Sequence, residues 1–223
     1  MATVLITGAN RGLGLEFARQ YAADGWTVIA CCREPAKAKE LNKLAGSIAV
    51  EALDVGVDAK IAALARRLKG RAIDLLINNA GVYGPRNGTD TGAWLDVFRV
   101  NSIAPHHLAH ALADNVARSE LKRIVSVSSA MGSIGENGSA GDYIYRSSKA
   151  ALNMTMKGLA NELKHRGVIV AVLSPGWVKT DMGGRGAPLK AADSIASLRQ
   201  VIARLKPKDS GKFFSHDGKP IPW

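Results

Sequence analysis

The sequence has few of the features that mark secreted or membrane proteins. Cysteine occurs only at Cys31 and Cys32 among 223 residues, and the Cβ vectors of adjacent residues diverge too far for a bridge. This excludes a disulfide framework and suits a reducing compartment. No apolar run approaches the roughly 20 residues that span a bilayer, and a strand-like run begins at Thr3, which leaves no room for a signal peptide. We expect a cytoplasmic protein with no membrane partner.

Aromatic residues are also scarce, at 5% of the chain, although the formal net charge is +11. A nucleic-acid surface combines clustered cations with stacking aromatics, whereas the Lys and Arg of this chain are scattered over many segments. We therefore expect a solvated basic surface and no nucleic-acid partner. His106, His110 and Asp114 have helical spacing, but no further Cys or His accompanies them, so we expect no metal site.

Apolar, β-branched runs alternate with stretches of helical periodicity along the whole chain. Strands are expected at Thr3–Thr7, Thr27–Cys32, Ile48–Leu53, Ile73–Ile77, Arg123–Val127, Val168–Leu173 and Lys212–Phe214. Helices are expected at Gly12–Ala23, Ala36–Ala45, Asp58–Lys69, Trp94–Ala117, Tyr143–Arg166 and Ala191–Leu205. This alternation predicts an α/β fold: a single doubly wound parallel sheet of the Rossmann type, with seven strands and helices on both faces. With no linker in sight, we expect one domain over residues 1–223, which holds both the nucleotide and the substrate site.

Several segments follow strand ends, where open α/β sheets bind ligands. The first strand runs into a glycine-rich turn, Thr7–Gly14, and a helical pattern follows it. Glycines at such a turn let a pyrophosphate approach the backbone, and the helix N-terminus offers N–H donors; alone, the turn equally suits a purely structural role. The stretches Gly81–Gly92 and Gly132–Gly141 are predicted loops.

Tyr145 and Lys149 lie four residues apart in a segment with helical periodicity, so they share one helix face. A nearby ammonium stabilises a phenolate and lowers the pKa of a tyrosine from about 10, which suits proton transfer near neutral pH. In isolation the pair equally suits an exposed helix face. Its interpretation depends on the surrounding motifs.

Those motifs occur in an order that resembles the short-chain dehydrogenase/reductase family over nearly the whole chain. The matching segments are the turn Thr7–Gly14, Asn78-Asn79-Ala80-Gly81, Asn101, Ser128-Ser129, Tyr145 to Lys149, and Pro175-Gly176. The Ala130–Asn137 stretch, the Tyr145–Asn153 stretch and the Phe213–Trp223 ending resemble in particular the C-factor-like and sniffer-like carbonyl reductases.

The resemblance implies a role for each matching residue. Tyr145 would protonate the substrate carbonyl or deprotonate the alcohol, and Ser129 would hold that oxygen. Lys149 would bind the nicotinamide ribose and lower the pKa of Tyr145, and Asn101 would position a water that relays protons to Lys149. Positions implied to bind the cofactor are Gly8, Asn10, Arg11, Gly12, Leu13, Gly14, Arg33, Asp54, Val55, Asn79, Ala80, Gly81, Tyr145, Lys149, Pro175, Gly176, Val178 and Thr180.

Two of these assignments have alternatives. Ser129 is preferred to Ser128 because Ser129 to Gly132 matches the family's serine followed by a glycine, while strand alternation turns Ser128 to the other side. Asp54 resembles the family's adenine contact, but an aspartate at this place also suits a helix cap.

The charges near the second strand indicate which nicotinamide cofactor is bound. An NAD site usually has a carboxylate at the end of this strand, and that charge would repel a 2′-phosphate. Here the strand ends at Cys32 and is followed by Arg33, and Arg11 lies in the glycine turn, so two guanidinium groups are available for the phosphate. NADP(H) is the expected cofactor, although Glu34 would favour NAD if it faced the ribose.

Three functions remain open. The first is an NADP(H)-dependent oxidoreductase that reduces an aldehyde, ketone or quinone-like carbonyl to an alcohol by hydride transfer. The second is an NADP(H)-binding regulatory or signalling protein with vestigial catalysis, against which the intact Tyr145 and Lys149 argue. The third is an NAD-dependent alcohol dehydrogenase. The family's pairing of the Trp94–Ala117 and Tyr143–Arg166 helices implies a homodimer or homotetramer, and Asp181–Pro188 lies where the family has its substrate lid.

Overall fold

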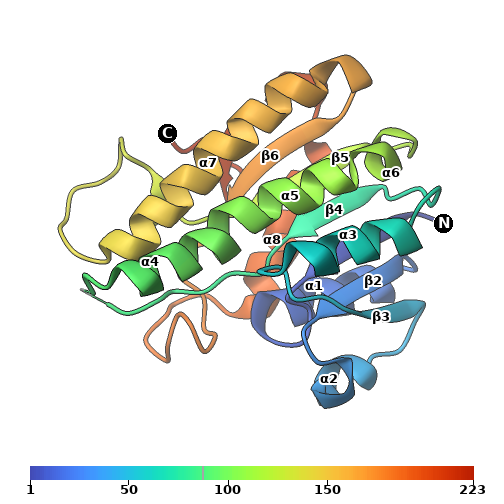
Figure 1. Ribbon diagram of the computed structural model, residues 1–223, viewed down its shortest axis with the longest axis horizontal. Coiled ribbons are helices and arrows are strands. Elements are labelled where there is room, and N and C mark those ends of the chain that lie inside the picture. Colours follow the sequence, from blue (N-terminus) through green and yellow to red (C-terminus); the bar gives the residue numbers. More distant parts are fainter. Residues whose placement is uncertain (87) are drawn as a thin grey trace.

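A single seven-stranded sheet forms the centre of the molecule in the computed structural model, which describes residues 1–86 and 88–223 (Figure 1). All adjacent strands are parallel, in the order β3-β2-β1-β4-β5-β6-β7. The strands are β1 (Thr3–Thr7), β2 (Thr27–Cys32), β3 (Ile48–Ala52), β4 (Leu75–Asn78), β5 (Arg123–Val127), β6 (Ile169–Ser174) and β7 (Lys212–Ser215). The doubly wound sheet predicted from the alternating pattern is confirmed.

Helices cover both faces of the sheet. They are α1 (Gly12–Ala23), α2 (Lys39–Asn42), α3 (Asp58–Arg67), α4 (Thr91–Phe98), α5 (Ala104–Ala111), α6 (Ala113–Ala117), α7 (Tyr143–Leu163) and α8 (Ala191–Arg204). In Figure 1, α3, α5 and α7 lie side by side in front of the sheet, and α1 and α8 lie behind it.

The strands are apolar along their whole length because each sheet face packs against a helix layer. Leu5 on β1 belongs to the core beneath α3, α5 and α7, while its neighbours Val4 and Ile6 belong to the core beneath α1 and α8. The same alternation separates Cys31 from Cys32, which are both free thiols in opposite cores. Burial on both faces is what makes these runs continuous rather than alternating in polarity.

The helix predicted over Trp94–Ala117 is wrong as a single element. It begins earlier, at Thr91, because the Asp90 carboxylate accepts a hydrogen bond from Ala93 N at 2.6 Å and caps α4. It then widens into a π-helical turn at Arg99–Ile103 and breaks again between α5 and α6. Pro105 explains the π turn, because it has no N–H to donate to the carbonyl four residues before it.

Most other bounds differ from the expectation by one or two residues. The larger exception is Ala36–Ala45, where a 3₁₀ turn over Pro35–Lys37 precedes the four-residue α2. The predicted loop Gly81–Gly92 ends inside α4, and Asn87 within it lies outside the described residues. In the described part of the chain, no helix is both long and apolar enough to cross a membrane.

Candidate active site

A cavity of about 510 Å³ opens at the carboxyl ends of the strands, where the chain leaves β1 toward β2 and leaves β4 toward β5. Strand order reverses here, and this is where doubly wound sheets bind their ligands. Predicted site residues on its wall are Gly8, Asn10, Arg11, Gly12, Leu13, Arg33, Asp54, Val55, Asn79, Ala80, Gly81, Tyr145, Lys149, Pro175 and Thr180. The structure thus brings most of the predicted positions together.

The glycine turn between β1 and α1 is shaped by close backbone contacts. Gly8 and Gly12 have φ values of +66° and +54°, which side chains rarely adopt. A Cβ at Gly14 would lie 2.2 Å from the Gly8 carbonyl oxygen, so this third glycine lets α1 begin directly against the turn. The first residues of α1, Gly12 and Leu13, therefore line the cavity beside the backbone of the glycine turn. Free N–H groups at such a helix N-terminus fit a pyrophosphate.

The motif after β4 is tied to the end of β1. The Thr7 hydroxyl accepts hydrogen bonds from the N–H groups of Asn79 and Ala80, both at 3.0 Å, and the Asn79 amide donates to Thr7 O at 2.8 Å. Gly81 follows, where a Cβ would lie 3.3 Å from Asn101 Oδ1 and 3.6 Å from Lys149 Nζ. These contacts set the spacing of the two strand ends and admit the side chains of Asn101 and Lys149.

Tyr145 stands on α7 at the wall of the cavity, with 7% of its surface exposed. Burial raises the pKa of its hydroxyl to about 12, while the nearby Ser129 hydroxyl lowers it. Ser128 points elsewhere and donates to Asn153 Oδ1 at 2.7 Å. Ser129, the serine favoured by strand alternation, is therefore the one beside the Tyr145 hydroxyl.

Lys149 lies one helical turn after Tyr145 and donates from Nζ to the Val127 carbonyl at 2.9 Å. Its ammonium is 5.7 Å from the centroid of the Tyr145 ring, and burial lowers its pKa to about 8. The expected lowering of the Tyr145 pKa is not seen: burial is the largest influence on this hydroxyl and raises its pKa. Tyr145 is accordingly protonated at neutral pH.

Asn101 lies in the π-helical turn and is fully buried behind the cavity. Its Oδ1 accepts from Val82 N at 2.9 Å, and its Nδ2 donates to Val82 O at 2.8 Å and to Ser148 Oγ at 3.0 Å. One lone pair of Oδ1 is left on the side of Gly81 where Lys149 Nζ also lies. Asn101 Oδ1 and Lys149 Nζ therefore both lie beside Gly81.

Two arginines line the opposite end of the cavity. Arg33 follows β2, and Arg11 extends from the glycine turn to Asp181 Oδ2 at 3.1 Å. Both partners of that ion pair are largely exposed, at 70% and 81%, so the pair contributes little free energy and leaves Arg11 available to another anion. Glu34 is paired with Lys37 and is not on the cavity wall.

Asp54 is the acidic residue that follows β3 on this wall. Its carboxylate accepts from Gly56 N at 2.9 Å, whereas the residue at the N-cap of α3 is Val57. The helix-cap alternative for Asp54 is therefore wrong. Its second oxygen is available at the position where the resemblance implies an adenine contact.

The segment predicted as a lid is a compact turn after β6. Trp177 Nε1 donates to Gly183 O at 2.8 Å, and Gly183 N donates to Thr180 Oγ1 at 3.2 Å. Thr180 also faces the glycine turn, because a Cβ at Gly12 would lie 3.7 Å from Thr180 Cγ2. These contacts place Thr180, at the start of this segment, against the glycine turn on the cavity wall.

Not every predicted residue lies on the cavity wall, and some wall residues were not predicted. The predicted residues that do not line this cavity are Gly14, Asn101, Ser129, Gly176 and Val178. Wall residues that were not predicted as site positions are Cys32, Leu53, Val82, Val100, Val127, Ser128, Asp181 and Met182. Most of these are sequence neighbours of predicted positions at strand ends. Asp181 and Met182 belong to the predicted lid segment, and Val100 directly precedes the predicted Asn101.

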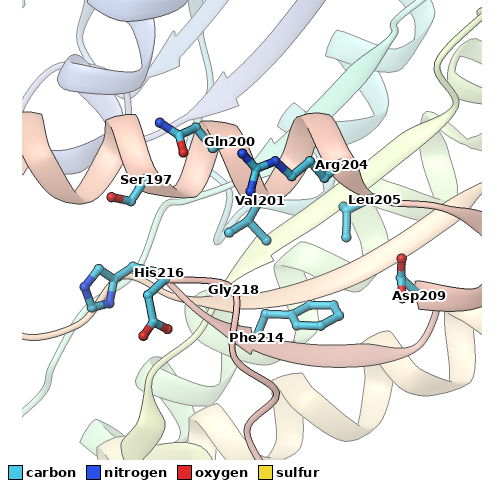
Figure 2. A pocket seen from close by; sticks show the side chains of 10 residues that line it. Ser197, Gln200, Val201, Arg204, Leu205, Asp209, Phe214, His216 and Gly218 are labelled. Atoms are coloured by element: carbon cyan, nitrogen blue, oxygen red, sulfur yellow. The ribbon is translucent and has the colours of Figure 1, made fainter.

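A second cavity, of about 320 Å³, lies between α8 and the end of β7 (Figure 2). Gln200 and Arg204 extend over it from α8, and His216 and Phe214 lie below them. Its two acidic residues are already paired: Asp209 accepts from Lys212 at 3.0 Å, and Asp217 lies 2.9 Å from Lys219 Nζ. None of the catalytic candidates lies on its wall, so we place the chemistry in the larger cavity.

His106, His110 and Asp114, which have helical spacing in the sequence, contact other side chains of the chain. The His106 and His110 rings stack with centroids 6.0 Å apart, and His110 Nε2 lies 3.3 Å from Glu162. Asp114 accepts from Arg166 at 2.7 Å. Within residues 1–86 and 88–223, no group of three or more His, Cys, Asp or Glu side chains is arranged to hold a metal ion.

Residues 2–188 match the family model of the short chain dehydrogenases. The chain belongs to this family. The C-signal protein of Myxococcus xanthus is 40% identical over 154 residues, which cover 68% of this chain and 93% of that protein. The carbonyl reductase Sniffer of D. melanogaster superposes with a TM-score of 0.92 and 33% identity, with all of both chains covered.

An NADPH-bound carbonyl reductase from chicken fatty liver is also similar to this short-chain dehydrogenase. It superposes with a TM-score of 0.90 and 35% identity, over 100% of this chain and 99% of that one. The resemblance stated from the motifs is confirmed by these matches. This chain is an oxidoreductase of the family, with carbonyl reductases among its structural neighbours.

Proposed function

We propose that this short-chain dehydrogenase is an NADP(H)-dependent carbonyl reductase for aldehydes, ketones or quinone-like compounds. The observation that carries the proposal is a buried, protonated Tyr145 beside Ser129, with the Lys149 ammonium 5.7 Å from its ring, on the wall of a dinucleotide-sized cavity. A cofactor-binding protein without catalysis needs no proton donor at this place.

A bound nicotinamide would supply the hydride that reduces the carbonyl carbon. Ser129 would donate a hydrogen bond to the carbonyl oxygen, and Tyr145 would transfer its hydroxyl proton to that oxygen as the alcohol forms. The raised pKa of Tyr145, about 12, keeps this proton in place at neutral pH and favours the direction of reduction. Lys149 stabilises the phenolate that remains, and the open lone pair of Asn101 suits a water that returns a proton through Lys149.

The preference for NADP(H) rests on charge. Arg11 and Arg33 line the same end of the cavity, Cys32 stands where an NAD site has its acid, and Glu34 is paired with Lys37. The NADPH-bound chicken carbonyl reductase and the glycine turn are consistent with this choice. Gly8 to Gly14 would hold the pyrophosphate, and Thr180 and Lys149 the nicotinamide end.

The test is NADPH oxidation with a panel of aldehydes, ketones and quinones, for the parent and for Tyr145→Phe. We expect the variant to lose turnover by a factor on the order of 10² or more, because the proton donor is gone. Tyr143→Phe, on an exposed tyrosine of the same helix, is the matched control. If NADPH binds but no carbonyl is reduced by the parent, the regulatory-binder function replaces this one; faster oxidation of alcohols with NAD would favour the dehydrogenase.

We also propose a cytosolic homodimer or homotetramer formed through the α4, α5 and α7 layer. Leu95 on α4 and Met154 on α7 expose 62% and 73% of their surfaces. A second subunit packed on this layer would remove both apolar side chains from water. Sedimentation of the parent and of a Leu95→Glu, Met154→Glu double variant tests this assembly. A monomeric parent would exclude it.

A further inference from the structure

A second tyrosine lies against the catalytic candidate. The ring of Tyr83 is stacked on the ring of Tyr145, with centroids 4.3 Å apart and an interplanar angle of 15°. Tyr83 comes from the loop after β4, more than sixty residues earlier in the chain than Tyr145. None of the family motifs includes it, and it does not line the dinucleotide cavity.

The backbone on both sides of Tyr83 is held in place. Val82, before it, is bonded through its N–H and its carbonyl to the side chain of Asn101, at 2.9 and 2.8 Å. Gly84, after it, has a φ of +76°, and a Cβ there would lie 2.7 Å from Val97 Cγ2 and 3.5 Å from Ile144 Cγ2. Tyr83 is thus presented from a loop that is anchored to α4, the π turn and α7.

The groups around the two rings complete a layered arrangement. Rings 4.3 Å apart leave no space for an ammonium between them, so Lys149, 5.7 Å from the Tyr145 centroid, lies on the far face of Tyr145. Arg86 lies over the ring of Tyr83 at 5.2 Å. The Tyr83 hydroxyl is 3.9 Å from the sulfur of Met131, two residues after Ser129 in the chain. One face of Tyr145 is therefore closed to water and to substrate.

We propose that Tyr83 is a positioning residue for the reaction: by stacking on Tyr145 it fixes the plane of the catalytic ring, so that the hydroxyl stays against Ser129. This inference rests on the proposed reductase function. A tyrosine ring rotates about two side-chain bonds, and Ser129 restrains only its hydroxyl end. Stacked aromatic pairs are stabilised beyond the burial of their area, which favours one orientation of the Tyr145 ring.

Tyr83 also contributes to the raised pKa of Tyr145. Burial is the main reason that its pKa is raised, and Tyr83 raises it further, whereas Ser129 lowers it. Tyr83 itself is influenced by burial and Asp142, which raise its pKa, and by Arg86 and Arg146, which lower it. Removing the Tyr83 ring would let water reach Tyr145 and lower the pKa of its hydroxyl.

The test compares three substitutions, Tyr83→Ala, Tyr83→Phe and Tyr83→Leu, with Tyr143→Ala as the exposed control. For Tyr83→Ala we expect kcat to fall by a factor on the order of 10 to 10², because small misplacements of a reacting group are costly. The dissociation constant of NADPH should change less than about twofold, because Tyr83 is off the cofactor wall. Tyr83→Phe, which keeps the stack, should restore most of kcat, and Tyr83→Leu, which only fills space, should not.

Phenolate absorbance gives a readout that does not depend on turnover. The titration of each protein minus that of its Tyr145→Phe counterpart isolates Tyr145, and its midpoint should move to lower pH by on the order of one unit in Tyr83→Ala. Equal rescue by Leu and Phe, or an Ala variant with the parent's kcat and midpoint, would overturn the proposal. If the parent reduces no carbonyl, the reductase function fails, and the titration still decides whether Tyr83 acts on Tyr145.

Discussion

Arg33 and Arg11 reach the same end of the cavity from the ends of two adjacent strands, β2 and β1. A 2′-phosphate there would receive charge-assisted hydrogen bonds, which are about twice as strong as neutral ones. The exposed ion pair of Arg11 with Asp181 costs little to break. At the scale of the single residue, the proposed preference for NADP(H) thus rests on two guanidinium groups and on the absence of an acid at Cys32.

Arg33→Ala should weaken NADPH binding by on the order of tenfold and leave NADH binding within about twofold, because only NADPH carries the 2′-phosphate. Fluorescence titration of both cofactors measures this. Lys37→Ala is the control, since Lys37 is exposed and pairs with Glu34 outside the cavity. Equal affinity of the parent for NADPH and NADH would show that the arginines do not select the phosphate.

The family motifs that contain the proposed catalytic residues were predictable because their order along the chain is distinctive. The protonation of Tyr145 was not, because the spacing of Tyr145 and Lys149 reports their distance along a helix but nothing about desolvation. Burial raises the pKa of the phenol and lowers that of the ammonium, and both effects depend on what the rest of the chain places around them.

At the scale of the element, α7 depends on close approach by the loop after β5. A Cβ at Gly132 would lie 2.7 Å from Lys149 Cβ and 2.8 Å from the Lys149 carbonyl carbon. Asn153 Nδ2 donates to the Gly132 carbonyl at 3.1 Å, which holds the two segments together. Gly132, which favoured Ser129 over Ser128 in the sequence analysis, therefore also allows the backbone at Lys149 to approach this loop.

Gly132→Ala should lower the free energy of unfolding by about 1–3 kcal/mol, because the new methyl group overpacks against the backbone of α7. Turnover should fall as well, since the displacement is felt first at Lys149. Gly138→Ala, in the same loop with no atom within 4 Å of the added Cβ, should leave stability within about 0.5 kcal/mol. Urea unfolding of both variants measures the difference, and equal stability would contradict the packing argument.

At the scale of the whole molecule, the buried Lys149 links stability to pH. Its pKa falls from 10.5 in the unfolded chain to about 8 in the fold, so between these values the unfolded state binds more protons. The free energy of unfolding must then rise with pH across this window, and below about pH 8 the buried charge is a constant cost. The raised pKa values of Cys31 and Cys32 act in the opposite direction, so a difference measurement is needed.

Lys149→Met removes this linkage and leaves the cysteines in place. Between pH 7 and pH 9.5 the parent should gain about 2 kcal/mol of stability relative to the variant, from a pKa difference of this size. Denaturant unfolding at the two pH values measures the gain. A constant difference between the two proteins would mean that Lys149 keeps its ordinary pKa in the fold.

The sequence by itself determined the seven-stranded sheet, the parallel direction of its strands and the grouping of the motifs at one edge. Those properties follow from short-range patterns: apolar runs, helical periodicity and the glycine turn that begins at Gly8 each act over a few residues. The stack of Tyr83 on Tyr145, the π turn that holds Asn101 and the approach of Asp181 to Arg11 were decided only by the tertiary structure. Each joins segments distant in the chain or depends on packing around a break, and no local pattern encodes which side chains will meet there.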